Sequence, residues 1–576
     1  MMGFRELKVE ERIELERRAC FAEDWDQVIV SNCFSVSQLS LCRFAGRVII
    51  GAGSRIHNSS IVNYALGEGC HIESVSLIEC QGESSFGNGV SVASLNECGG
   101  RSIKIYDSLT AQIAYISTIY RHRTEVINRI NSMVEEYATQ HKSSMGSIGQ
   151  AVRIVGAGII RNVKIGNNVT IEGSSILSNA TLLDGVYFGA DVKAHDFIAV
   201  EGAKVDNGAT IERCFVGENV ILSNGFTAVD SLFFASSHCE NGEAASVFAG
   251  PYTVSHHKSS LLIAGFFSFF NAGSGSNQSN HLFKCGPVHQ GVHLRGCKFG
   301  SSAYVMLPAI NGAFTSVIGS HNSHHDTSDF PFSYLVNKEG RSTIIPAANI
   351  SSYGYQRDTE KWVKRDKRRV KRDILNLEPH NPYIATMVID AINTTNQMLD
   401  KNPDAQSYIH NKAVISANNL QRGLSLYNKA IAASLGEMLS YDDPSREGLG
   451  RCRWVDVAGQ YITKSYMEST LDAVERGELN SLDQIDQLFG EFARSYNAYA
   501  YDWAVGILTE LLGHAPSTEE IASTIKAASR TQEEILAMAN RDKMRDSSDA
   551  MSISYGMDSG KNIEERLADF RAVRDL

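Results

Sequence analysis

Aliphatic residues recur at intervals of six along the first part of the chain, usually with glycine directly after the first of each pair. Clear copies of the pattern occupy residues 50–56, 66–72, 165–171, 205–211 and 216–222. A period of six fits neither the 3.6-residue period of a helix nor the alternation of a single strand. It predicts a solenoid of short parallel strands, in which one aliphatic residue per interval points inward and small residues turn the corners.

Helical periodicity appears in three places. Residues 5–24 read as an amphipathic helix that buries Leu7, Ile13, Leu15 and Cys20 and caps the first coil. Apolar residues return to helical spacing at 107–150, and again over most of 355–576. We therefore expect a mainly β protein with added helices, divided as follows: capping helix 1–27, solenoid 28–106, helical insertion 107–150, solenoid with long functional loops 151–354, and helical domain 355–576.

Composition narrows the class of protein. The net charge of −11 disfavours a nucleic-acid scaffold. No stretch reaches the roughly 18 apolar residues of a membrane span, and the N-terminus lacks a signal-peptide core. The 11 cysteines form no Cys-x-x-Cys pair, which is typical of buried thiols in a reducing compartment. We expect a cytoplasmic protein with no nucleic-acid or membrane partner.

The first candidate site is the stretch Asn96–Arg101, which contains two consecutive glycines. Glycines let backbone approach a ligand closely, and Glu97 and Arg101 supply a catalytic acid and an anion clamp. Asn96 and the later Gln112 are expected to bind substrate. The alternative is a bulge at which the chain leaves the solenoid, fixed by an ion pair.

The second candidate site lies between residues 258 and 298, and it includes the stretches Asn277–His281 and Gly286–Lys298. His281 or His289 can serve as a general base, because a histidine pKa lies near the working pH. Amide side chains would orient the base or support an oxyanion, and cations would hold phosphates. The expected binding residues are Asn277, Gln278, Asn280, Gln290, Arg295 and Lys298. Alternatively, these residues merely line solenoid corners.

The third candidate is the stretch 321–329, in which His321 and Asp329 are expected to contact substrate. Imidazoles and carboxylates could also hold a divalent metal, although their spacing matches no zinc signature. The weak metal candidates are His293, His324, His325 and Asp326. A hydrogen-bonded polar loop is the favoured interpretation, so we expect no metal.

A basic run covers residues 361–374, where apolar residues keep helical spacing. The favoured interpretation is an amphipathic helix with a solvated basic face. The alternative is a surface that binds phosphates or an acidic neighbour.

Several phrases together resemble an uncharacterised bacterial family of long, single-chain, left-handed β-helix proteins. They are Cys20-x-x-x-x-Trp25, Asn96–Arg101, Gln112–Tyr115, Tyr120–Arg123, Asn277–His281, Gly286–Gly291, His321 and Ser328–Leu335. The resemblance covers about residues 5–350. It implies a left-handed solenoid of the hexapeptide-repeat transferase type, with three six-residue intervals to a coil, and a trimer. It implies no established reaction, and the nucleotidyltransferase half of the sugar-nucleotide pyrophosphorylases is missing here.

The leading functional hypothesis is a transferase acting on a sugar or sugar nucleotide, with acyl-CoA as co-substrate and a histidine base. One alternative is a metal-dependent hydratase or hydrolase built on the histidines. Another is a non-enzymatic sugar-nucleotide-binding or scaffold protein.

Overall fold

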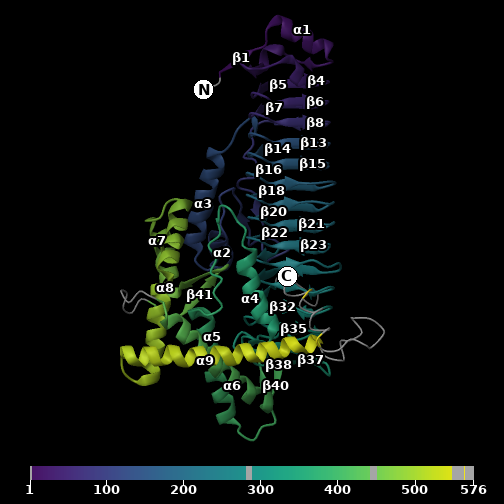
Figure 1. Cartoon of the computed structure of the whole chain (residues 1–576). Helices are drawn as coiled ribbons and strands as arrows, with labels where there is room; N and C mark the ends of the chain where they lie inside the picture. The colour runs from purple at the N-terminus through teal and green to yellow at the C-terminus, as the bar shows by residue number, and fades with distance from the viewer. Residues whose placement is uncertain (1–2, 280–288, 442–449, 548–563, 565–571, 573–576) are drawn as a thin grey trace.

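A computed structural model describes residues 3–279, 289–441 and 450–547, together with the single positions 564 and 572. It confirms a mainly β architecture with added helices, built on a parallel β-solenoid (Figure 1). In this described part of the chain, every helix is too short or too polar to cross a lipid bilayer.

Each central coil of the solenoid contains 17 residues. Strands β14 (Ile159–Ile165), β16 (Ile176–Leu182), β18 (Lys193–Ala199) and β20 (Thr210–Val216) pair in parallel at this offset. The buried inward positions fall at Ile171, Leu177, Leu182 and Phe188, at spacings of six, five and six. The resemblance implied three six-residue intervals, or 18 residues, to a coil. The coil is one residue shorter because one of its three intervals has five residues.

The five-residue interval spans a corner built on one left-handed residue, which we call the αL corner. Its residues in consecutive coils are Asn162, Asn179, Asp196, Arg213 and Asp230, with φ between 48° and 54°. Asn and Asp adopt this conformation more readily than most residues. The seven-residue strands turn here between two faces of the prism. The third face consists of short strands such as β13 (Arg153–Val155), β15 (Thr170–Glu172) and β17 (Tyr187–Phe188).

Both ends of the solenoid are closed. Helix α1 (Val9–Arg17) and the antiparallel pair β1 (Phe4–Glu6) and β3 (Val28–Ser31) cover the first coil (Figure 1). Leu7, Leu15 and Cys20 are buried as expected, whereas Ile13 is exposed. The antiparallel hairpin of β37 (Tyr334–Lys338) and β38 (Arg341–Ile345) ends the ladder at the other side. Neither end therefore presents an open parallel edge.

The helical insertion leaves the solenoid at the αL corner, earlier than the periodicity indicated. The chain exits after β9 (Leu77–Glu79) and returns at β12 (Gly146–Ile148), and the two strands pair with the two halves of β14. The excursion contains the hairpin β10 (Ser91–Val92) and β11 (Ile103–Lys104), then α2 (Ala111–Ile119) and α3 (Thr124–Gln140). Residues 80–106, assigned to coils from the sequence, belong to this excursion.

A second excursion leaves from the same corner. Strands β27 (Leu261–Ile263) and β28 (Gly265–Phe267) are separated by the single αL residue Ala264. In the next coil, β30 (Asn277–Ser279) and β31 (Gly291–His293) pair with them but are separated by residues 280–290.

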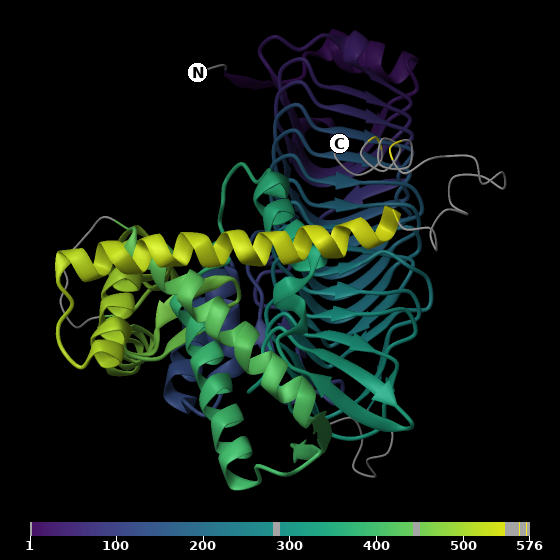
Figure 2. The same ribbon diagram turned by 60° about the horizontal axis from the view of Figure 1, so that its bottom comes forward.

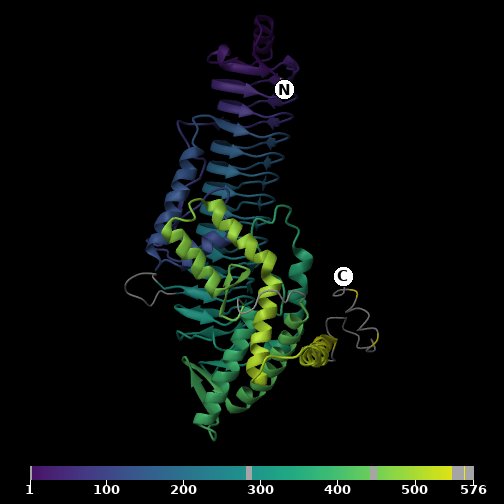
Figure 3. The ribbon, with the colours of Figure 1, turned by 90° about the vertical axis from the view of Figure 1, so that its left-hand side faces the viewer.

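The helical domain packs on the side of the solenoid that carries the insertion (Figure 3). Its elements are α4 (Tyr353–Arg365), α5 (Pro382–Lys401), the hairpin β39 (Ser407–His410) and β40 (Ala413–Ser416), α6 (Ala417–Leu439), the hairpin β41 (Trp454–Val457) and β42 (Gln460–Thr463), α7 (Lys464–Arg476), α8 (Leu482–Leu512) and α9 (Thr518–Lys543). One hydrophobic core joins the three parts, and includes Ile113 of α2, Phe215 and Phe248 of the solenoid, and Phe489 of α8. The helical domain is thus fixed to the solenoid through the insertion.

Candidate functional site

The first half of the insertion runs along the αL corner. Its backbone N–H groups donate to coils that lie progressively further along the solenoid: Gln81 to Asn162 (2.7 Å), Gly87 to Asn179 (3.1 Å), Ala93 to Asp230 (3.1 Å) and Leu95 to Ser246 (2.7 Å). The coil after Ser246 contains Ala264, and the next holds residues 280–290. Because coils are about 4.8 Å apart, Leu95 lies roughly 10 Å along the axis from the level at which β30 ends and β31 begins. The described ends of the second candidate stretch therefore lie two coils beyond the level at which Leu95 contacts the corner.

The turn itself is held by Asn96. Its side chain is buried, accepts from the Cys98 N–H (3.2 Å) and donates to the Gly99 carbonyl. Gly99 and Gly100 have φ of 75° and 82°, a conformation that glycine adopts without strain. Asn96 thus shapes the turn, and Glu97 lies on its exposed side. Partial burial and the nearby Glu243 raise the pKa of Glu97.

Arg101 and Arg121 form the most informative electrostatic feature of this corner. Arg121 donates to the carbonyls of Ser102 and Ser117 (3.3 Å each). Burial and the positive charge of Arg101 lower the pKa of Arg121. Among the residues that the structure describes, no carboxylate forms an ion pair with either arginine. Two neighbouring guanidinium groups without a counter-charge are suited to hold an anion such as a phosphate.

Neighbouring contacts fix Arg121 at this level of the solenoid. The Tyr115 ring on α2 lies 5.7 Å from the Phe266 ring of β28 and 6.1 Å from that of Tyr120. Arg123, two residues further on, pairs with Glu468 (3.0 Å), Asp472 (2.5 Å) and Glu475 (2.5 Å) of α7. Arg123 therefore joins the insertion to the helical domain, and Arg121 is the arginine of this segment that we assign to the candidate site. Arg121 and Arg123 both belong to the stretch Tyr120–Arg123, and nothing in the sequence distinguishes their roles.

Some side chains of the second candidate stretch lie on the outer surface of the prism, and others point into its interior. Asn277 is half-buried on the outer side of β30, and His289 and Gln290 are half-buried just before β31. Asn280 and His281 lie outside the described residues.

A chain of polar side chains runs inside the prism instead of facing a substrate. His293 bonds to Gln278 (3.2 Å) and Asn311 (2.8 Å), and Asn311 bonds to His325 (3.0 Å). His321 is also buried and bonds to Ser342 (2.9 Å). Burial lowers the pKa of His293 and His325 to about 3 and that of His321 to about 4, so all are neutral near pH 7. The proposed binding roles of Gln278 and His321 do not fit this burial.

Three other candidates connect the helical domain, or the linker before it, to the insertion or the solenoid. Gln112 is buried and donates to the carbonyls of Ile374 (3.0 Å) and Val457 (3.3 Å). Lys298 pairs with Asp358 of α4, and Asp329 with His410 (2.9 Å). These contacts occupy the groups that were expected to bind substrate.

Arg295 is a fourth connecting residue, and its side chain is almost fully buried. Its guanidinium pairs with Asp456 (3.3 Å) and lies 3.8 Å from the Phe269 ring centroid and 4.4 Å from that of Tyr461. It also donates to the carbonyls of Asn376 and Gly459. Arg295 therefore docks the β41–β42 hairpin and is not available for a substrate phosphate.

The weak metal candidates do not converge. Within the described ranges, no three His, Cys, Asp or Glu side chains are grouped as metal ligands. His293 and His325 belong to the internal chain, and Asp326 accepts from the N–H (2.9 Å) and hydroxyl (2.6 Å) of Ser328.

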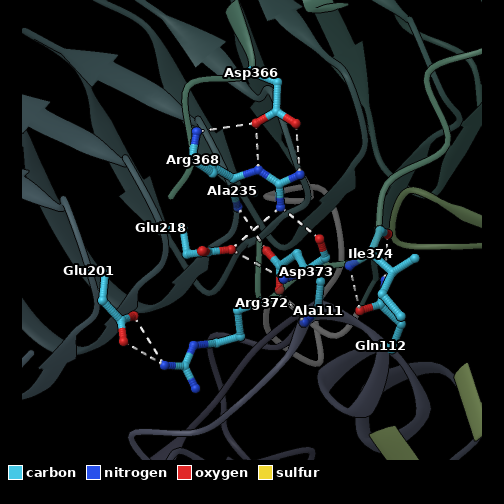
Figure 4. Close-up of polar contacts among 10 residues, drawn as sticks. All are labelled: Ala111, Gln112, Glu201, Glu218, Ala235, Asp366, Arg368, Arg372, Asp373 and Ile374. Carbon is cyan, nitrogen blue, oxygen red and sulfur yellow. Dashed lines mark hydrogen bonds and ion pairs between the residues drawn. The ribbon is translucent and has the colours of Figure 1, made fainter. Parts of the chain in front are cut away.

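The first residues of the basic run belong to α4, which ends at Arg365. The rest of the run begins the linker between α4 and α5 (residues 366–381) and binds this linker to the solenoid (Figure 4). Arg368 pairs with Asp366 (2.8 Å) and Glu218 (3.4 Å), and Arg372 pairs with Glu201 (2.9 Å). Glu201 and Glu218 occupy the same place in consecutive coils. The expected amphipathic helix over 361–374 is therefore too long, because solenoid glutamates hold the second half in an irregular path.

Asp373 adds a further contact between the linker and the rest of the molecule. Its carboxylate accepts from the N–H groups of Ala111 (2.8 Å), at the start of α2, and Ala235 (3.0 Å), in the solenoid (Figure 4). One buried side chain thus connects the linker, the insertion and a coil.

Two family models and one relative match this chain. Residues 437–576 match a family model described as a domain of unknown function (DUF6819). An uncharacterised protein of Treponema pallidum (strain Nichols) is 22% identical over 600 residues, which cover 88% of this chain and 82% of that protein. A second model, described as a domain of unknown function (DUF4954), matches residues 53–399, which include both excursions and the arginine pair. Because this match spans more than half of the 576 residues, the chain belongs to the DUF4954 family.

Proposed function

We propose that the αL corner around Arg101 and Arg121 binds the phosphate groups of a sugar nucleotide or an acyl-CoA. The observation that carries the proposal is the pair of arginines without a carboxylate partner among the described residues. Gly99 and Gly100 leave open space on the turn beside them, since an added Cβ at either would meet no atom within 4 Å.

In this proposal the protein is a hexapeptide-repeat-type transferase. A base, His289 or His281, takes the proton from a sugar hydroxyl or amine. The freed lone pair forms a bond to the acyl carbon, the thioester C–S bond breaks, and the thiolate leaving group takes up a proton. Asn277 and Gln290 would position the acceptor, and Glu97, with its raised pKa, could supply a proton. The parallel solenoid supports this class only at the level of fold.

The trimer and the cytoplasmic location are parts of the same proposal. The described cysteines are free thiols, which is in keeping with a reducing compartment. The insertion runs along the αL corner and the helical domain packs with it on the adjoining face, so a trimer would have to associate through other faces. Light scattering coupled to size-exclusion chromatography measures the assembly directly.

Binding measurements with UDP-sugars and acetyl-CoA test the site. Arg101→Ala and Arg121→Ala should each weaken binding about 10-fold or more, because a hydrogen bond to a charged group contributes roughly 1.5–3 kcal/mol. Arg47→Ala is the matched control, since Arg47 is exposed near the same corner several coils away. His289→Ala should lower acyl transfer by roughly 10²–10⁴ if His289 is the base.

Three results separate the alternatives. Binding of neither ligand to the wild-type protein, or equal binding by the arginine variants, would contradict the anion site. Binding that depends on the arginines without any turnover would identify a ligand-binding protein. Turnover that is unchanged in His289→Ala would exclude His289 as the base.

A further inference from the structure

A cavity of about 290 Å³ lies beneath α9, between the last coils of the solenoid and helices α4, α5 and α6. Apolar side chains make up most of its wall, including Phe332 of the solenoid, Ile384 and Val388 of α5, and Ile535 and Leu536 of α9. None of its lining residues belongs to the αL-corner site. Figure 2 shows α9 running from the helical domain across to the solenoid.

Helix α9 is held on both sides of the cavity. On one side Ala528 packs so closely on α6 that a Cβ added at Gly436 would lie 2.0 Å from its own. On the other side the Asp542 carboxylate accepts from the Tyr353 N–H (3.1 Å). Residues 532–539, between these two attachments, form the wall. Within this segment Gln532 also donates to Glu437 (3.4 Å) and Glu534 pairs with Lys429, both of α6. An occupant of the cavity would therefore contact a part of α9 that is fixed in place.

The wall also contains polar groups from α4, α6 and the segment before α5. His380 and the buried Ser434 are hydrogen-bonded to one another (3.0 Å). The Oε1 atom of Gln356 is buried and has no hydrogen-bond partner in the described structure, while its amide nitrogen donates to Glu360 (3.3 Å). An unpaired buried acceptor costs free energy, which a ligand donor would remove.

The charges of the wall define what can enter. Glu360 is the charged residue among the described lining residues, which include no lysine or arginine. Burial also lowers the pKa of His380, so the imidazole is neutral near pH 7. An anionic ligand would be buried without a counter-charge, which is strongly unfavourable.

We propose that this cavity binds a small uncharged amphipathic molecule, with its apolar body among the α5 and α9 side chains and its hydroxyl donating to Gln356. At about 30 Å³ per water-sized group, the volume accommodates roughly ten such groups. This ligand is independent of the transferase proposal, because the two sites share no residue.

Straight-chain primary alcohols from butanol to dodecanol are the probes, followed by calorimetry and thermal shift on the full-length protein. The dissociation constant should fall about fourfold per methylene, the ratio that corresponds to ~0.8 kcal/mol per buried group, and level off near ten carbons. Ionised carboxylates of equal length should bind at least 10-fold more weakly.

Two variants on α9 locate the site. Ala539→Phe places a ring in the cavity and should abolish binding, whereas Ala537→Phe, on the exposed side of the same helix, should not change it. Gln356→Leu keeps α9 intact and should weaken alcohol binding by roughly 2–10-fold, the effect of one neutral hydrogen bond. The absence of saturable alcohol binding to the wild-type protein would overturn the proposal. So would undiminished binding by Gln356→Leu, or carboxylates that bind as well as alcohols.

Discussion

The hydroxyl of Tyr64 donates to the Val163 carbonyl (2.8 Å) and accepts from the Val163 N–H (3.0 Å), although the two residues lie two coils apart. The corner of the intervening coil is missing, because the chain has left after β9. Gly146, which resumes that coil, has no side chain, and a Cβ there would lie 2.2 Å from the Tyr64 ring. Tyr64 thus fills the gap that the insertion opens in the ladder.

Removing this hydroxyl should destabilise the solenoid locally. Tyr64→Phe leaves two buried backbone groups of Val163 unpaired, so we expect a loss of about 1–3 kcal/mol. Hydrogen exchange followed by mass spectrometry should show faster exchange of the Val163 amide. Tyr187→Phe, on the outer face of the solenoid, is the control and should change neither quantity. Unaltered exchange at Val163 in Tyr64→Phe would contradict the assignment.

The internal histidine chain predicts loss of stability in acid. In the unfolded protein His293, His321 and His325 take up protons near pH 6.5, whereas burial keeps them neutral in the folded state down to about pH 3–4. The three neutral histidines therefore contribute fully to the free energy of unfolding above pH 6.5. As the pH falls, this free energy decreases by roughly 1.4 kcal/mol per pH unit for each histidine. Denaturant unfolding between pH 7 and 4 measures the slope. His321→Gln should make the dependence of stability on pH shallower. An identical slope in this variant would contradict the assignment of the acid sensitivity to the buried histidines.

Asp486 predicts the opposite dependence. Burial raises its pKa to about 7, even though the Thr110 hydroxyl donates to it (2.8 Å). The unfolded carboxylate loses its proton near pH 4, so stability decreases as pH rises from about 4 to 7 and stays lower above that. Asp486→Asn keeps an acceptor for Thr110 and should be more stable than the wild type by about 4 kcal/mol at pH 8, with little difference at pH 4. Glu491→Gln, at an exposed position further along α8, is the control. A stability gain that does not change with pH would refute the argument.

Arg295 should couple the solenoid to the helical domain. Arg295→Ala leaves Asp456 buried without its cation and is expected to cost about 3–5 kcal/mol. Lys298→Ala breaks the more exposed pair with Asp358 and should cost about 1 kcal/mol or less. Calorimetry should then show the helical domain melting before the solenoid in Arg295→Ala. Adding Asp456→Asn should recover part of the loss, since it removes the unpaired charge, and a further loss would argue against the pair.

The repeat could be predicted from sequence because every inward position must be apolar, and neither a helix nor an isolated strand produces six-residue spacing. The five-residue interval was harder to detect, since its corner residue varies among Asn, Asp and Arg. The insertion was placed too late because residues 80–106 contain many glycines and no helical period, so they resemble coils. Candidate residues such as Arg295 and Gln112 were chosen by type, and type does not reveal burial. The path of the insertion along the αL corner depends on tertiary hydrogen bonds such as that of Leu95 to Ser246, which the sequence does not reveal.

Both excursions depart from the αL corner, while the strands on either side keep their register with the adjacent coils. The length of chain between two such strands therefore has little effect on the packing of the prism. Differences in length among relatives should accumulate at this position, and foreign segments could be spliced in here without redesign of neighbouring coils. The corner provides the family with a place to acquire new binding surfaces at little cost to the scaffold.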